Sequence, residues 1–449
     1  GLGDVYKRQV LDGKIPFEEM VYTEGEERTQ YFVRNIRVEF GTTLVHSRKI
    51  SIRAMIEMEV GCETLIEEET AVDLESSASI YKKQKPVNLL KLHTAKKDTY
   101  RIKEEITIPG TKESIGQVLL TDITGRKLEV RAAQDELLLR GELQIFCMYL
   151  SEEGKTDWLE QSVPYEGRIE CSGATEGMYY DVQHALEDTL ADVRMDEDGE
   201  MRIIGIEGTV SVRINLYEEE ELNLLEDLYS LEQKVSYQTR EAVYEELLLQ
   251  NQSKCKIVEN LSLPELKDDV LQICHSSGSV QIEHVETRAE KQGGILIEGI
   301  LHVSFLYLKA DDALPFGNWQ GMVPFSYLLE CPDMPKDVRY QLSNRVEQIS
   351  VTMTGSDSVE VKAVLDFDVF LRKEVPMQVI TEVSLEETDR EELAKKPGIV
   401  GYMVKSGDDL WTLAKQYMTT EESIRQINHL ENGKIKPGDK LIICKEIGM

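Results

Sequence analysis

An internal repeat constrains this 449-residue chain more than any other feature of its sequence. GELQIFCMYL at Gly141–Leu150 aligns with GILHVSFLYL at Gly299–Leu308, and four of the ten positions are identical. Further along, VPYEGRIEC at Val163–Cys171 aligns with VPFSYLLEC at Val323–Cys331, in the same order. The unit spans about 150 residues, whereas solenoid repeats have about 20 to 50, so each copy is expected to be a domain.

A third copy is present in part near the amino terminus. IPFEEMV at Ile15–Val21 takes the position of the VPF segments, and ISIRAMIEMEV at Ile50–Val60 aligns with VEVKAVLDFDV at Val359–Val369. The first half of this copy is therefore predicted to be missing. Residues 1-9, GLGDVYKRQ, resemble a translated sequencing-adapter junction, so we expect them to be non-native and the true start to be absent.

The repeats carry the pattern of half-buried strands. Apolar and polar residues tend to alternate in Gly141–Leu150, Ile50–Val60 and Val359–Val369, and turn-forming clusters separate such segments. This pattern predicts a mainly β fold, with antiparallel sandwich- or barrel-like repeat domains. Between the repeats, Ser230–Leu249 and Ser384–Lys396 are rich in Glu, Leu, Lys and Arg, which predicts short helices or linkers.

The last fifty residues differ in kind. Val400–Met449 holds seven basic and seven acidic residues, so it is neutral and the excess negative charge lies upstream. The strand Tyr402–Val404 is followed by Asp408, which is expected to cap a helix over DLWTLAKQY. Thr419 and Glu422 predict a capping box for a second helix, and KPGDKLIIC predicts a turn and a strand. The expected elements follow in the order βααβ and form a small α+β domain.

The segment Tyr402–Ile443 resembles the LysM module along its whole length. LysM modules are βααβ domains, and the resemblance implies binding of N-acetylglucosamine-containing glycans, such as peptidoglycan, between the two loops. Asp409 departs from the family's pattern, because it puts a carboxylate that only accepts hydrogen bonds where the family has the hydroxyl of Thr. By position, the resemblance implies a groove lined by Gly407, Asp408, Asp409, Leu410, His429, Leu430, Ile435 and Pro437.

The upstream repeats, from about Leu11 to Glu386, resemble the SPOCS domain, which is often joined to a carboxy-terminal LysM in spore-forming Firmicutes. The predicted organisation has five parts after the junction at residues 1-9. They are a truncated first repeat at 10-85, a second repeat at 95-240, a third repeat at 251-386, a linker at 387-399 and the LysM domain at 400-449.

The combination resembles SipL-like spore coat assembly proteins. It implies a non-enzymatic structural and assembly role in the mother-cell cytoplasm, at the forespore surface and the spore coat. There the β-rich repeats would form a platform, and the LysM module would dock onto a coat morphogenetic protein. The alternative is a cell-wall protein whose LysM module binds peptidoglycan glycan. We favour the assembly role, and a signal peptide in the complete gene would favour the wall.

The charge balance excludes two classes of partner. With 51 Lys and Arg against 83 Asp and Glu, the formal net charge is −32, so phosphate backbones and anionic lipid headgroups would repel the surface. We therefore expect no nucleic-acid partner. The sequence has no run of the about 18 apolar residues that a membrane-spanning helix needs, so we also expect no transmembrane segment.

The cysteines predict neither a metal site nor redox chemistry. They are odd in number and scattered, and no CxxC pair occurs, so we expect buried thiols in a reducing compartment and no cofactor. The seven are Cys62, Cys147, Cys171, Cys255, Cys274, Cys331 and Cys444. Cys171 and Cys331 occupy equivalent repeat positions, which favours packing over reactivity.

Other candidate sites have simpler interpretations. Trp411 could stack on a sugar, but it lies inside a helix that must bury one face, so core packing is favoured. Cys274, His275 and His284 could be part of a metal site, yet neighbouring strand residues point to opposite faces and no fourth ligand is near. No metal is therefore expected.

Acidic runs could supply calcium ligands or paired catalytic carboxylates. Asp196–Gly199 lacks the ligand spacing of an EF-hand, so a hairpin turn is expected instead. Glu67–Glu69 and Glu218–Glu221 are interpreted as solvated strand edges, which discourage aggregation. GxSxG, P-loop, GxGxxG and HExxH motifs are absent from the sequence, so no catalytic residue and no enzyme activity are expected.

Overall fold

The computed structural model describes residues 13, 15–24, 28–46, 48–267, 269–309, 315–388, 397–430 and 434–446. The chain divides into two compact units. The first combines Gly1–Ile66, Lys91–Glu218 and Leu247–Lys373, and the second combines Glu67–Leu90, Glu219–Glu246 and Glu374–Met449. Each unit is thus assembled from three separate stretches of the chain.

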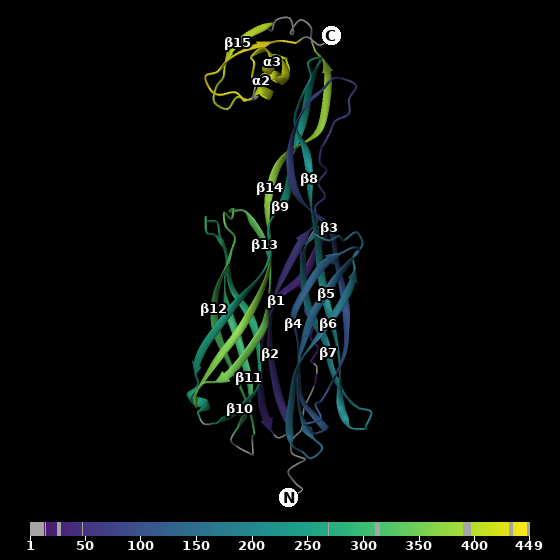
Figure 1. Ribbon diagram of the computed structural model, residues 1–449, viewed down its shortest axis with the longest axis vertical. Helices are drawn as coiled ribbons and strands as arrows, with labels where there is room; N and C mark the ends of the chain where they lie inside the picture. The colour runs from purple at the N-terminus through teal and green to yellow at the C-terminus, as the bar shows by residue number, and fades with distance from the viewer. Residues whose placement is uncertain are drawn as a thin grey trace. The chain divides into compact units, whose positions relative to one another are not determined.

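Two β-sandwiches with the same topology make up most of the first unit (Figure 1). In one, the sheet β4–β5–β6 packs on the sheet β3–β8–β7, and in the other the sheet β10–β11–β12 packs on the sheet β13–β14–β9. The first set of strands is β3 Tyr81–Thr107, β4 Ile115–Ala133, β5 Glu136–Ser151, β6 Thr156–Glu170, β7 Tyr179–Met195 and β8 Met201–Tyr229. The second is β9 Gln233–Ser262, β10 Val270–Arg288, β11 Gly294–Lys309, β12 Phe316–Glu330, β13 Val338–Met353 and β14 Ser358–Glu387, with a short 3-10 helix at Pro264–Leu266.

The equivalence of the two sandwiches agrees strand by strand with the sequence repeat. The pairs β4–β5, β5–β6 and β7–β8 are antiparallel, as are β10–β11, β11–β12 and β13–β14. Strands account for 71% of the structure and helices for 4%, which confirms the mainly β class. The domain boundaries predicted from the sequence stay predictions. The junction at residues 1-9 and residues 389–396 of the linker lie outside the described residues.

Alternating side chains fill each sandwich. On β5, Leu143, Ile145 and Cys147 are fully buried, and every second residue of β11 from Ile295 to Tyr307 is buried. Apolar residues of both sheets form a single cluster in each sandwich. Burial of the apolar surface of these side chains is the main favourable contribution to folding, at roughly 25 cal/mol per Å² of surface removed from water. The alternation of apolar and polar residues in the sequence therefore corresponds to alternating buried and less buried side chains along each strand.

The truncated first copy forms a two-stranded antiparallel sheet in the first unit. Its strands are β1, Thr29–His46, and β2, Lys49–Thr64. The preceding segment Ile15–Glu24 forms no strand. Cys62 on β2 is exposed and Cys444 is half-buried, so the expectation of buried thiols holds for five of the seven cysteines.

The two predicted inter-repeat helices are wrong where the structure describes them. Gln233–Leu249 belongs to strand β9, and Ser384–Glu387 is the end of strand β14. Both strands lie in one sheet, so pairing with neighbouring backbone outweighs the weak helix preference of Glu, Leu and Lys. The remainder of the second predicted helix lies at residues 389–396, outside the described residues.

The acidic run at Asp196–Gly199 is the hairpin turn that the sequence predicted. It joins β7 to β8, and the backbone N–H of Asp196 donates to the carbonyl of Glu200 at 2.8 Å. The Asp196 carboxylate accepts from the N–H groups of Asp198 and Glu200 at 3.0 and 2.9 Å. Gly199 has a φ of 82°, a conformation that favours glycine. The carboxylate of Asp196, the first residue of the run, thus holds the turn.

A largely buried histidine, whose side chain is 10% exposed, joins the two sandwiches. The ring of His275 on β10 stacks on Phe146 of β5, with centroids 4.2 Å apart, beside an apolar cluster that includes Met148 and Cys274. Its Nε2 lies 2.8 Å from a carboxylate oxygen of Asp122. Its Nδ1 lies 3.6 Å from a carboxylate oxygen of Glu160. Burial alone would lower the pKa of His275, but these two carboxylates outweigh burial and raise the pKa to about 8.

We predict that this contact stabilises the first unit in a pH-dependent way. Because the folded pKa lies above the unfolded value of 6.5, the contribution is complete below about pH 6.5 and is lost as the pH rises through about 8. His275→Gln should lower the free energy of unfolding in urea by about 2 kcal/mol at about pH 6 and by much less at about pH 9.5. The matched control is His284→Gln, at an exposed position of the same strand. Equal destabilisation by His275→Gln at both pH values would contradict the assignment.

Candidate functional site

The carboxy-terminal module has the predicted order of elements. Strand β15, Ile399–Met403, pairs antiparallel with β16, Lys440–Cys444, and the helices α2, Leu410–Tyr417, and α3, Glu421–Ile427, lie between them in sequence. Its small core is one cluster, to which both helices and both strands contribute. The fully or nearly buried members from the module are Val404, Leu410, Trp411, Leu413, Ala414, Ile424, Leu441 and Ile443.

Both predicted helix caps are displaced by one residue. The carboxylate of Asp409, not of Asp408, accepts from the backbone N–H of Thr412 at 2.7 Å and caps α2. The hydroxyl of Thr420, not of Thr419, accepts from the N–H of Ser423 at 3.0 Å and caps α3. Neighbouring residues offered two chemically equal caps in each case, and the packing of the helices decided between them.

The two loops of the predicted groove are joined at their bases. The N–H of Val404 donates to the carbonyl of Asp439 at 2.9 Å, and the N–H of Gly438 donates to the carbonyl of Val404 at 2.8 Å. These bonds fix the loop that follows β15 against the turn that precedes β16. Gly407 and Gly438 both have a φ near 93°, so each loop turns at a glycine.

The predicted groove residues differ in what they can offer a ligand. Leu410 is buried, and Leu430 and Ile435 pack on the module's core, so they are mainly structural. Asp408 is engaged within the module, where it accepts from the hydroxyl of Tyr402 at 2.8 Å and from the N–H of Lys405 at 2.7 Å. The exposed members are Gly407, His429 and Pro437. The groove itself stays a prediction.

The module packs on strand segments of the second unit. We name these segments, Glu67–Leu90, Glu219–Glu246 and Glu374–Glu387, the stem. An apolar cluster that includes Leu225, Leu228 and Ile380 holds the stem together.

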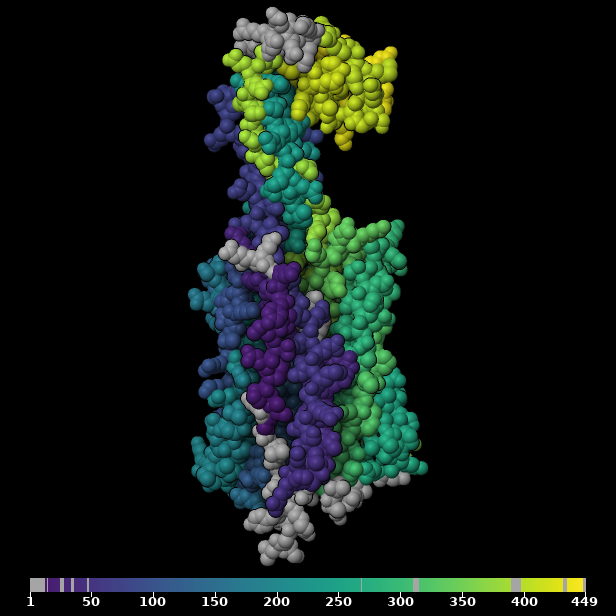
Figure 2. Space-filling model, turned by 180° about the vertical axis from the view of Figure 1, so that it is seen from behind, coloured from purple at the N-terminus to yellow at the C-terminus, as the bar shows by residue number. Residues whose placement is uncertain are grey.

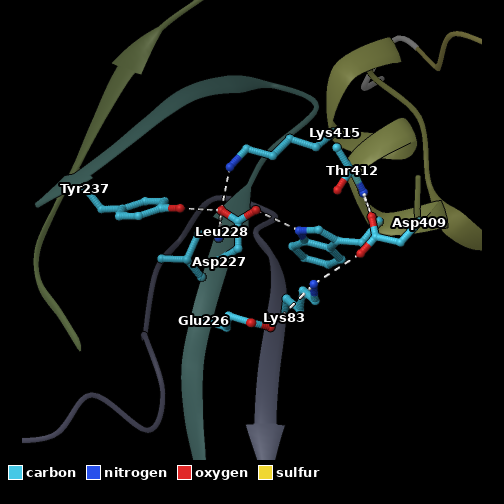
Figure 3. A network of polar contacts seen from close by, with 9 residues as sticks. Lys83, Glu226, Asp227, Leu228, Tyr237, Asp409, Thr412 and Lys415 are labelled. Atoms are coloured by element: carbon cyan, nitrogen blue, oxygen red, sulfur yellow. Dashed lines mark hydrogen bonds and ion pairs between the residues drawn. The ribbon is translucent and has the colours of Figure 1, made fainter. Parts of the chain in front are cut away.

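Asp227 of the stem is the centre of the contact (Figure 3). One carboxylate oxygen accepts from the indole N–H of Trp411 at 2.8 Å, and the other accepts from the ammonium of Lys415 at 2.5 Å. The hydroxyl of Tyr237 and the N–H of Leu228 donate to the same carboxylate, at 2.6 and 2.8 Å. Burial would raise the pKa of Asp227, but these four donors outweigh it and hold the pKa below its ordinary value. Four donors around one charge form a specific receptor for the face of α2 that carries Trp411 and Lys415.

A second ion pair involves Asp409, one of the predicted groove residues (Figure 3). The ammonium of Lys83 lies 3.3 Å from the Asp409 carboxylate and 3.4 Å from that of Glu226. Partial burial would raise the pKa of Asp409, but the hydrogen bonds from Thr412 and Lys83 lower it overall. The carboxylate that departs from the LysM pattern therefore both caps α2 and binds the stem.

Aromatic packing completes the contact. Trp411 is buried and meets Tyr229 edge to face, with centroids 4.8 Å apart, and Tyr229 stacks on Tyr81. The hydroxyl of Tyr229 donates to the carbonyl of Thr419 at 3.0 Å. Core packing of Trp411, favoured from the sequence, is confirmed, and the stem adds Tyr229, Leu231 and Tyr81 to that core. Sequence reasoning missed Asp227, Tyr229 and Lys83, because isolated residues of strands in another part of the chain give no local signal.

The outer face of the module's sheet is apolar and exposed. Ile399, Met403 and Ile442 point away from the core and are between 52 and 71% exposed. Gly401, opposite Ile442, has open space where a side chain would be. Lys440, opposite Met403, adds one ammonium group to this face. Exposed aliphatic side chains on one face are typical of a protein contact rather than of a sugar site.

The remaining candidates show structural roles. Cys274 is buried beside Phe146, and His275 contacts carboxylates. Within the described part of the chain, no group of three or more His, Cys, Asp or Glu could hold a metal ion. In the acidic runs, Glu68 pairs with Arg240 at 2.6 Å and Glu218 with Lys91 at 3.3 Å. Among the described residues, no helix is long and apolar enough to span a membrane.

We predict that Asp227→Ala releases the module from the stem. It leaves the buried Trp411 indole and the Lys415 ammonium without their acceptor, which should cost the contact about 3 kcal/mol. Hydrogen–deuterium exchange in Leu410–Tyr417 should therefore accelerate by about a hundredfold, while exchange in β5 stays unchanged. The control is Asp198→Ala, in the exposed turn between β7 and β8. Unchanged exchange in α2 would show that Asp227 does not hold the module.

The same contact should respond to acid. Because the folded pKa of Asp227 lies below its unfolded value of about 3.9, its contribution is complete above about pH 5 and is lost as the pH falls through the folded pKa. Once corrected for the intrinsic pH dependence of amide exchange, exchange in α2 should thus be slow at neutral pH and rise below about pH 4. A rise that is the same in the Asp227→Asn variant would contradict this origin.

Comparisons with known families agree with this geometry. A family model described as "LysM domain" matches residues 402–443, and one described as "SipL, SPOCS domain" matches residues 114–194 and 269–354. The two SPOCS segments correspond to β4–β7 and β10–β13. A search of curated proteins and a search of solved structures each found no match. The resemblance to SPOCS and LysM domains is confirmed.

Proposed function

We propose that this protein is a non-enzymatic assembly protein of the spore coat or envelope. The chain carries SPOCS segments of the SipL type and a carboxy-terminal LysM domain, and it is thus sporulation-related. Both domain types are non-catalytic binding or structural modules, and together they indicate association with the spore coat or the cell wall. In this proposal the LysM module docks onto a coat morphogenetic protein, and the paired sandwiches form the platform that presents it. The chain acts in the mother-cell cytoplasm at the forespore surface.

The observation that carries the proposal is the exposed apolar face of β15–β16. Ile399, Met403 and Ile442 offer dispersion contacts and no hydrogen-bond partner, so they suit an apolar protein surface and not a hydroxylated sugar. The module is bound to the stem through α2, on the opposite side of its core from this face. A partner can therefore reach the face while the module stays attached.

The alternative function is binding of peptidoglycan, which LysM domains as a class bind. We propose the eight groove residues Gly407, Asp408, Asp409, Leu410, His429, Leu430, Ile435 and Pro437 as the surface for such a ligand. Against glycan binding stands the chemistry of Asp409, whose carboxylate is already used by the helix cap and by Lys83. A glycan at this position would have to compete with an ion pair of the chain itself.

Pelleting with purified peptidoglycan sacculi separates the two functions. We expect the full chain to stay in the supernatant from low to high salt, and the Asp409→Thr variant, which keeps a capping side chain and restores the hydroxyl, to pellet more. Asp409→Asn is the matched control, because it caps the helix without charge or hydroxyl. Salt-resistant pelleting of the unmodified chain would overturn the docking proposal in favour of the wall, since charge attraction alone fades with screening.

Recruitment in sporulating cells tests the docking face directly. A fluorescent fusion of the chain should gather at the forespore, and Ile442→Lys should abolish this, because a charge in the centre of the apolar face opposes its burial. The melting temperature should not change, since Ile442 is exposed. Gln416→Lys adds the same charge at an exposed position of α2 and should be recruited normally. Normal recruitment of Ile442→Lys would remove this face from the mechanism.

A further inference from the structure

The two-stranded sheet β1–β2 has an apolar face that corresponds to a buried face in both complete sandwiches. Tyr31 on β1 lies opposite Cys62 on β2, and the equivalent pairs are Tyr180 with Leu216 and Tyr340 with Leu371. This register makes β2 the counterpart of the first halves of β8 and β14. It also agrees with the sequence alignment of Ile50–Val60 with Val359–Val369.

The equivalent residues differ sharply in exposure. On β14 the seven inward residues are at most 4% exposed; they are Val359, Val361, Ala363, Leu365, Phe367, Val369 and Leu371. Their counterparts on β2 are also all apolar; they are Ile50, Ile52, Ala54, Ile56, Met58, Val60 and Cys62. Yet Ile50, Ile52 and Val60 are 40 to 47% exposed, and Cys62 is exposed as well. Figure 2 shows the dark purple amino-terminal segment uncovered on this side of the molecule.

Strand β1 extends the same open face. Its residues Val38, Phe40 and Leu44 lie opposite Ile56, Ala54 and Ile50, and all three are 55 to 70% exposed. A contiguous apolar surface of this kind marks an interaction site in a soluble chain.

The other face of the sheet contacts the two complete sandwiches at one end. The Arg213 guanidinium of β8 lies 3.9 Å from the centre of the Phe32 ring and pairs with Glu63, which also accepts from Asn215 at 3.3 Å. Glu63 accepts from the side-chain amide of Gln341 on β13 as well. The sheet is therefore fixed to both complete sandwiches at one end of its outer face, whereas the rest of that face is exposed and carries charged residues such as Glu57, which is 72% exposed. The inner face is the one whose counterparts are buried in both complete sandwiches.

A second, independent observation is the segment Ile15–Glu24. By sequence it corresponds to β6 and β12, whose inward residues, such as Val163, Tyr165 and Val323, are buried. Here the counterparts Ile15, Phe17 and Val21 are 56 to 68% exposed and the segment forms no strand. In both complete sandwiches this strand pairs with the central strand β5 or β11. The segment thus has the side chains of an edge strand and lacks the strand it should pair with.

We propose that the open face of β1–β2 is the inner surface of a third β-sandwich, and that its occupant is a set of three strands joined directly to Ile15. The first strand, of the β3 or β9 type, pairs with the free edge of β2. The next two form a hairpin of the β4–β5 type, on which Ile15–Val21 pairs as the third strand. Their side chains alternate between apolar and polar, with the apolar set covering Ile52, Val60 and Phe40.

The repeat itself argues for this occupant. In both complete sandwiches the covering strands come directly before the VPF strand in the chain, with only four residues between β5 and β6 and six between β11 and β12. A second copy of this chain would bring another two-stranded sheet and no central strand for Ile15–Val21. Three strands that precede Ile15, one beside β2 and two in a hairpin that pairs with Ile15–Val21, satisfy both the open face and the unpaired segment.

A grafting experiment tests the proposal. A copy of Lys91–Ser162, which ends at the equivalent of Lys14, is placed directly before Ile15 and replaces the residues that precede it. A second graft uses a copy of Leu247–Met322 from the other sandwich, so that the result does not depend on one donor. For the chain without a graft, we expect fast amide exchange in β2 and binding of a hydrophobic dye. At least one graft should slow exchange in β2 by tenfold or more and reduce dye binding, while the protein stays monomeric.

The matched control carries Leu143→Asp and Ile145→Asp at the copied positions of the first graft. It has the same length, but its central strand cannot face an apolar surface, so β2 should exchange as fast as in the ungrafted chain. Two outcomes would overturn the proposal. One is fast exchange in β2 with both grafts. The other is an ungrafted chain that sedimentation velocity shows to be a dimer with β2 protected, because the occupant would then be a second copy.

Discussion

A β-sheet whose residues are apolar on one side needs a second sheet to cover that side, and this constraint organises the whole first unit. Both complete repeats meet it by packing a sheet of three consecutive strands on a second sheet, which is made of the strand before them and the two strands after them. The cores of the two sandwiches consequently use equivalent positions of equivalent strands. Where the first copy supplies only β1 and β2, the same residue pattern lies exposed. Burial thus follows from the number of strands present and not from any change in the residues.

The second unit depends on a different kind of interaction, because the main contact between the LysM module and the stem is polar. Asp227 is surrounded by four donors, and the aromatic rings of Tyr229 and Trp411 shield that cluster from water. A half-buried carboxylate is costly unless it is paired, so such a cluster is specific about which surface it accepts. It binds the α2 face of the module and leaves the outer face of β15–β16 exposed. The orientation of the module on the stem therefore decides which of its surfaces a partner meets.

These two features fit the proposed role of a scaffold with a carboxy-terminal docking module. The sandwiches are joined to each other through His275 and an apolar cluster, and they carry their excess negative charge on outward strand faces. The module itself is neutral, so long-range repulsion of an acidic partner is weakest there. Its only departure from the LysM pattern that we identified, Asp409, is used for attachment to the stem. A carboxylate that would weaken sugar binding thus has a structural reason to be present.

The sequence alone determined the repeat, the alternation of strands, the turn at Asp196–Gly199 and the βααβ order of the module, because all of these depend on neighbours along the chain. It predicted helix caps only to within one residue, since Asp408 and Asp409, like Thr419 and Thr420, are chemically equal candidates. Tertiary structure decided the rest. Gln233–Leu249 is a strand because it lies in a sheet with β14, and the stem contact joins Asp227 to residues about 190 positions away. Such pairings depend on which surfaces meet in space, and that information is spread over the whole chain.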